Sequence, residues 1–210
     1  MKVHLVRWAW LLPMSSVLLA LVLHHASGEA TATIVFISQA DASGLEGAVF
    51  TVGLSASALL QMVVVNGMTR GRPRVFIERT SGLVAALCVL LMANLSMYDA
   101  LDAHISSALG IFIAGGVWLA AVEVRATRNA CMSGSMQRRA AVALVAVGLV
   151  AMMLAVRFAV QADPTGPMVP TRDAGHPWWT VAALAEYLLV AGLWWGIAAI
   201  GPDEALYAST

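Results

Sequence analysis

A histidine and two carboxylates stand at or inside long apolar stretches of this sequence, where they could do chemistry. Asp102 and His104 open one apolar stretch, and Glu186 is the ninth residue of the last one. A histidine beside a carboxylate can act as a general acid or base, and Ser106 or Ser107 could complete a hydrolase-like triad. Residues i and i+2 of a helix do not face each other, so His104 and Ser106 should diverge. His104, Asp102 and Glu186 are therefore weak catalytic candidates. The alternative is a histidine that caps the helix or bonds locally.

Glu186 needs an explanation in any case, because a carboxylate inside a membrane span is costly and usually has a partner in the protein interior. At 1.5 Å per residue it sits roughly 12 Å below the outer end of its helix. Arg157, near the end of the preceding apolar stretch, is the candidate partner. Two interpretations stay open: a contact that packs helices together, or a role in lipid head-group binding or proton chemistry.

The elements that carry these residues are long apolar blocks. Apolar residues make up 60% of the 210 residues and charged residues only 11%, whereas about 25% is usual in soluble domains. Blocks of about 20 residues match the thickness of a bilayer. The sequence predicts a single all-α domain over 1–210, an integral membrane bundle of six transmembrane helices at about 5–24, 48–66, 80–97, 105–124, 140–160 and 178–200. The first block follows Lys2 and Arg7 and could instead be a cleaved signal peptide.

Arginines decide the predicted orientation, since short loops rich in Lys and Arg stay in the cytoplasm. Two loops, after the second and fourth blocks, hold eight of them: Arg70, Arg72, Arg74, Arg79, Arg125, Arg128, Arg138 and Arg139. Both termini should then be cytoplasmic. These basic loops could also attract anionic lipids or a cytoplasmic protein partner; the alternative is that they only set the topology.

Six polar residues should gather on the opposite, non-cytoplasmic side. We call them the polar layer: Asn94, Asp99, Asp102, His104, Arg157 and Glu186. This layer would either hold the bundle together or cradle a lipid head group.

Several other functions find no support in the residues. The net charge is zero, so nothing indicates a nucleic-acid partner. The histidines lack metal-ligand spacing, and neither a metal nor a cofactor is predicted. Cys88 and Cys131 should lie at different depths, so a disulfide is not expected. A transporter would need a polar path, but the second, third and fifth blocks are almost free of ionisable groups. The oligomeric state is left open.

Three places in the sequence, Phe36–Leu60, Gly82–Leu119 and the pair Glu186 and Tyr187, resemble the Frag1/DRAM/Sfk1 family of membrane proteins. The segment Phe36–Leu60 is similar to the family's first outer loop and the helix after it. In Gly82–Leu119, Asn94 and His104 match the Asn that ends the third helix and the His that opens the fourth. The third place is Glu186 followed by an aromatic residue.

The sequence departs from the family pattern at two positions. Gln39 stands where the family often has Asp, and Leu95 replaces a common aromatic residue. The resemblance implies six helices with cytoplasmic ends, in an endomembrane (lysosome, Golgi or ER) or the plasma membrane. It implies a non-enzymatic role in membrane-lipid organisation, trafficking or autophagy-type regulation. The alternative is a lipid-modifying enzyme, as in GPI-anchor lipid remodelling.

Overall fold

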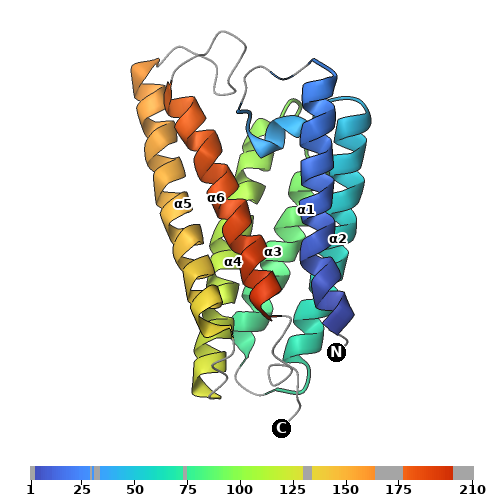
Figure 1. Ribbon diagram of the computed structural model, residues 1–210, viewed down its shortest axis with the longest axis vertical. Coiled ribbons are helices and arrows are strands. Elements are labelled where there is room, and N and C mark those ends of the chain that lie inside the picture. Colours follow the sequence, from blue (N-terminus) through green and yellow to red (C-terminus); the bar gives the residue numbers. More distant parts are fainter. Residues whose placement is uncertain are drawn as a thin grey trace.

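The computed structural model describes residues 3–28, 30, 34–72, 75–129, 134–163 and 177–200 of the protein. Six long α-helices in this part of the chain form one bundle (Figure 1). They are α1 (Val3–Ala26), α2 (Leu45–Thr69), α3 (Phe76–Asn94), α4 (Leu101–Arg128), α5 (Ser135–Ala162) and α6 (Pro177–Ile200). Each is long and apolar enough to cross a membrane. The predicted all-α, six-helix membrane fold is therefore confirmed.

Successive helices run in opposite directions along the bundle (Figure 1). The start of α1 and the end of α6 lie at one end, which we call the N/C end. The short 3₁₀ helix η1 (Ile37–Ala40), between α1 and α2, lies at the opposite end, which we call the η1 end. His104 is in the first turn of α4, and α4 begins at the η1 end (Figure 1).

The helices extend beyond their predicted limits at the N/C end. α4 continues to Arg128 and α5 begins at Ser135, so most of the predicted basic loop is helical. α3 spans 76–94 rather than 80–97. Hydropathy marks only the apolar part of a helix, whereas the backbone stays helical through polar residues whose side chains find partners.

Glycines allow α5 and α6 to pack backbone against backbone. A Cβ atom on Gly148 would lie 3.1 Å from the backbone nitrogen of Leu189, and one on Gly192 would lie 3.1 Å from that of Val145. Gly196, one turn further, faces a side chain of α4 instead, that of Leu119. The GxxxG pair of α6 thus serves two different neighbours, in line with the use of small residues where membrane helices approach closely.

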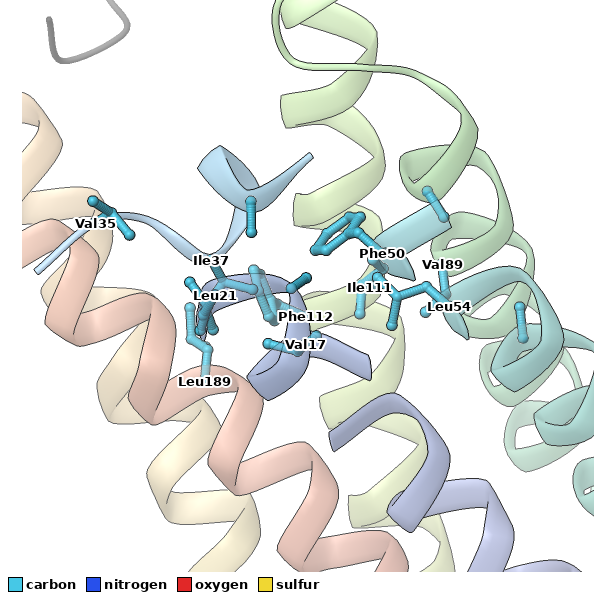
Figure 2. Packing of buried hydrophobic residues seen from close by; sticks show 14 of the residues in the cluster. Val17, Leu21, Val35, Ile37, Phe50, Leu54, Val89, Ile111, Phe112 and Leu189 are labelled. Atoms are coloured by element: carbon cyan, nitrogen blue, oxygen red, sulfur yellow. The ribbon is translucent and has the colours of Figure 1, made fainter. Parts of the chain in front are cut away.

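The apolar core at the η1 end includes the segment that enters η1. Figure 2 shows Ile37 beside Leu21 of α1 and Leu189 of α6, with Phe50 of α2 and Phe112 of α4 in the same cluster. All five side chains are buried. The connection between α1 and α2 therefore turns into the bundle before α2 begins, and this brings backbone groups of η1 to α6.

Candidate functional site

Glu186 binds the start of η1 to the middle of α6. The backbone N–H of Ile37 donates a hydrogen bond of 2.6 Å to Oε2 of Glu186. The backbone and hydroxyl groups of Ser38 also hydrogen-bond to this carboxyl group. The first N–H groups of any helix lack partners within that helix, so a carboxyl oxygen is a suitable acceptor. Glu186 is buried, as a carboxyl group with three internal donors should be.

The predicted pairing of Glu186 with Arg157 is corrected by this geometry. Arg157 is exposed on α5, and within the described residues no ion pair joins it to Glu186. A long arginine side chain near a helix end can reach the membrane interface, so it is not obliged to enter the bundle.

Two further hydrogen bonds fix the shape of η1. The backbone N–H of Phe36 donates to Oε1 of Gln39 at 2.8 Å. The hydroxyl group of Tyr98, in the turn between α3 and α4, donates to the backbone oxygen of Gln39 at 3.2 Å. Gln39, where the resembling family often has Asp, thus acts as a local cap in this chain.

One ring nitrogen of His104 is hydrogen-bonded, and the other is buried without a partner among the described residues. Nδ1 lies 2.6 Å from the backbone oxygen of Leu95, and the residue is only 3% exposed. Nε2 is buried with no hydrogen-bond partner among the described residues. Asp102 is exposed and is not the partner of the ring, so the predicted local bond of His104 goes to the backbone.

A cavity of about 160 Å³ lies between η1, α4, α5 and α6. Its polar lining residues are His104, Glu186 and Ser38. The remainder of the lining is apolar: Phe36, Met97, Leu101, Ile105, Ala108, Leu109, Phe112, Met152, Val156 and Trp179. We call this the outer cavity. His104 and Glu186, the two residues that the sequence singled out, therefore line the same cavity.

The outer cavity lies where α4 and α5 separate. Towards the N/C end these helices touch, since a Cβ on Gly116 would lie 3.2 Å from Cγ1 of Val145. Towards the η1 end they diverge (Figure 1). Two lining residues on α4, Ile105 and Leu109, remain 36% and 37% exposed on the side of the bundle. The cavity is therefore reached from the flank of the bundle, which faces lipid when the helices span a membrane.

A second, internal cavity of about 90 Å³ lies deeper in the bundle. It shares Ser38, Phe112 and Glu186 with the outer cavity. Nε1 of Trp118, which lines it, is buried without an acceptor among the described residues. Apolar space thus continues beyond Glu186 towards the middle of the bundle.

The remaining residues of the polar layer are spread over the surface. Asn94, Asp99 and Asp102 are exposed, as is Arg157. Asn94 joins α3 to α2 through a 3.0 Å hydrogen bond from Nδ2 to Oγ of Ser55. The structure thus brings together only His104 and Glu186 of the six.

Asp41, which the sequence reasoning missed, is a buried carboxyl group directly after η1. Its pKa is raised to about 6: burial is the main cause and the neighbouring Asp99 adds to it, while hydrogen bonds from the Thr51 side chain and the Met97 backbone oppose the rise. Its Oδ2 atom has no hydrogen-bond partner in the described part of the chain.

We expect Asp41→Asn to change the pH dependence of stability. The folded pKa, about 6, exceeds the reference value of 3.8, so a bound proton favours the folded state. This contribution is complete below pH 3.8 and disappears as the pH rises through 6. The wild type should lose about 1–3 kcal/mol of unfolding free energy over this range relative to the Asn variant. Melting temperatures between pH 4 and 8 measure this, with exposed Asp102→Asn as the control. Parallel profiles for wild type and Asp41→Asn would contradict it.

The N/C end carries a buried ionic cluster that was not predicted either. Oε2 of Glu123 accepts from Nε of Arg138 at 2.7 Å, and Oε1 accepts from Nε of Arg139 at 2.8 Å. The hydroxyl of Ser135 donates to the same Oε1 atom at 2.6 Å. We call Glu123, Ser135, Arg138 and Arg139 the α4–α5 clamp.

A second ion pair connects α3 to α4 at the same end. Glu78 accepts two hydrogen bonds from Arg125, of 2.8 and 3.0 Å. The sequence feature that could have indicated these ion pairs is that both acidic residues lie close to arginines: Glu78 precedes Arg79, and Glu123 shortly precedes Arg125.

These contacts show which arginines of the two predicted basic loops have partners inside the bundle. Arg125, Arg138 and Arg139 lie on helices and neutralise internal carboxylates. Arg70, Arg79 and Arg128 are exposed, Arg72 is partly exposed, and Arg74 lies outside the described residues.

No protein-family model, curated protein or solved structure matches the chain at a significant level. The resemblance to the Frag1/DRAM/Sfk1 family therefore stays a prediction. Within the described residues, no group of three His, Cys, Asp or Glu side chains is placed to hold a metal ion.

Proposed function

We propose that this multi-pass membrane protein binds a membrane lipid in the outer cavity and serves, without catalysis, in membrane-lipid organisation or trafficking. One observation carries the proposal. An almost wholly apolar cavity on the flank of the bundle ends at a buried histidine nitrogen that has no partner among the described residues. Ligand sites commonly combine an apolar lining with a few polar groups that fix orientation.

We also propose that the protein belongs to the Frag1/DRAM/Sfk1 family. As a member it would reside in an endomembrane or the plasma membrane and take part in lipid organisation or autophagy-type regulation. His104 and Glu186, two residues that carry the resemblance, are also two of the three polar residues that line the outer cavity. A shared fold alone does not define a function, so the cavity is the stronger support.

Mass spectrometry of co-purified lipids tests the proposal. The wild type should enrich one lipid class over the surrounding membrane. Ala108→Phe, which fills the outer cavity, should lose that enrichment. The matched control is Ala56→Phe, which places the same side chain on an exposed position of α2 away from the cavity. If Ala108→Phe and Ala56→Phe retain the same lipids as the wild type, no lipid occupies the outer cavity and the proposal fails.

A lipid-modifying enzyme is the second candidate. The observation in its favour is that the Leu95 carbonyl orients the ring of His104 while Nε2 stays available in the cavity that Glu186 also lines. A histidine held in this way can accept a proton from a hydroxyl group or water. If the enriched lipid carries a chemical change that is lost in His104→Ala, this reading replaces the first.

We also propose that the N/C end faces the cytoplasm. The described arginines of 70–79 and 125–139 lie at this end, and loops rich in Lys and Arg stay cytoplasmic. A reporter fused after Thr210 should read as cytoplasmic, and a tag inserted at Gly166 should be accessible only from the other side. A cytoplasmic tag at Gly166 would contradict this orientation.

A further inference from the structure

We infer that the ligand of the outer cavity is an uncharged lipid whose head is a free hydroxyl group that donates a hydrogen bond to Nε2 of His104. Diacylglycerols and sterols share this chemistry. The inference rests on the proposed function and specifies the class of lipid that the same site selects.

The bond of His104 to the backbone determines what the ligand must offer. A carbonyl oxygen can only accept, so Nδ1 carries the proton that it donates to Leu95 at 2.6 Å. In the neutral ring, Nε2 is then an acceptor. Because this nitrogen is buried without a partner in the described part of the chain, a ligand that donates a hydrogen bond would relieve an unsatisfied polar atom.

The charges around the cavity argue against a phosphate head group. Neither Lys nor Arg is among the described residues that line it. The other ionisable residue in the described lining is Glu186, which repels an anion when ionised and offers it no countercharge when neutral. Phosphate sites in proteins normally supply arginine, lysine or several backbone N–H groups, and the N–H groups at the start of η1 are already bonded to Glu186.

The direction of the cavity fits a small head group with an apolar body below it. His104 lies in the first turn of α4, near the η1 end. Apolar lining residues then follow along the same helix at Ala108 and Phe112, each about 6 Å further into the bundle. A lipid with its hydroxyl at His104 would therefore place its apolar part along this stripe. The internal cavity beyond Phe112 extends that apolar path.

Photo-cross-linking in phosphatidylcholine nanodiscs tests the class of lipid. Four probes with a diazirine in the apolar part are compared: a diacylglycerol, its methyl ether, the matching phosphatidic acid, and a sterol. Cross-links are mapped to peptides that cover 101–112 and 152–156. The wild type should react with the diacylglycerol or the sterol about tenfold more than with the ether or the phosphatidic acid, the effect of one neutral hydrogen bond. The probe that dominates identifies the source of the hydroxyl group.

Two variants extend the test. His104→Phe keeps a ring in place but removes the acceptor, and should reduce labelling by the hydroxyl probe to that of the ether. Ala56→Phe should behave as the wild type. The comparison of diacylglycerol with its ether uses the wild-type protein, so it does not depend on the folding of any variant.

The outcomes separate the two proposals. Equal labelling by the hydroxyl probe, its ether and phosphatidic acid within the cavity would overturn the hydroxyl inference and leave a lipid site in place. No labelling of the cavity peptides by any of the four probes would overturn the proposed function as well.

Discussion

Glu123→Gln should lower the melting temperature of the protein by on the order of 10 °C. Glu123 is the shared acceptor of the α4–α5 clamp, and its principal donor, Arg138, is only 1% exposed. Without the carboxylate, the buried guanidinium group of Arg138 loses the ion pair that Glu123 supplies. Removing one partner of a buried ion pair costs about 3–5 kcal/mol, and in a chain of this length each kcal/mol corresponds to roughly 2–4 °C. Thermal unfolding in detergent, followed by circular dichroism, measures the change.

Arg139→Gln is the matched control for Glu123→Gln. Arg139 donates to the same carboxylate at 2.8 Å, but its side chain is 60% exposed. An exposed ion pair contributes about 0–1 kcal/mol, so this variant should melt close to the wild type. Arg138→Met together with Glu123→Gln should recover part of the loss, because neither charge is then left alone in the interior. Equal losses for Arg139→Gln and Glu123→Gln would show that burial does not set the strength of the clamp.

The clamp has a consequence for the opposite end of the molecule. It joins α4 to α5 at the N/C end, and the close approach of Gly116 to Val145 continues that contact. At the η1 end the space between the same helices is the outer cavity. A fixed junction at one end allows the two helices to stand apart at the other without separating altogether. The N/C end of the α4–α5 pair thus contributes stability, and its η1 end provides the accessible cavity.

The six helices could be predicted from the sequence because length and hydropathy alone limit what can cross a bilayer. Their ends could not, since helix continuation depends on whether polar residues find partners. Arg125 and Arg138 illustrate this: each appeared to belong to a solvated loop, and each is on a helix with a carboxylate from elsewhere in the chain. Ion pairs between residues that are far apart in the sequence cannot be predicted from local residue patterns.

The candidate site was predictable to a different degree. The sequence singles out Glu186 and His104 because ionisable groups are rare and costly in apolar surroundings. It could not identify their partners, most of which are backbone groups, such as the N–H of Ile37 and the carbonyl of Leu95. Every residue carries such groups, so residue types give no signal for them. Only the inward path of the segment before η1 places one of them against α6.

Glu186→Leu should release η1 from α6. This variant keeps most of the side-chain volume but removes every acceptor, so the N–H group of Ile37 and the donors of Ser38 lose their partners. A buried donor left unsatisfied costs about 1–3 kcal/mol. The cost is avoided if η1 opens locally, because water can then hydrogen-bond to these N–H groups. Amide hydrogen exchange in a peptide that covers 34–41 should therefore accelerate by about one to two orders of magnitude.

Glu186→Gln separates the loss of acceptors from other effects of the change. Its amide oxygen can still accept the bond from Ile37, so exchange in 34–41 should rise much less than in Glu186→Leu. Leu184→Ala, at an exposed position of the same helix, should leave that peptide unchanged, and a peptide within α3 serves as the internal reference. Unchanged exchange in 34–41 for Glu186→Leu would mean that the apolar contacts of Ile37 hold η1 without the carboxyl group. If η1 is released, Phe36 and Ser38 move with it, and both of these residues line the outer cavity. The lipid that we propose should therefore be lost in Glu186→Leu, even though His104 is intact.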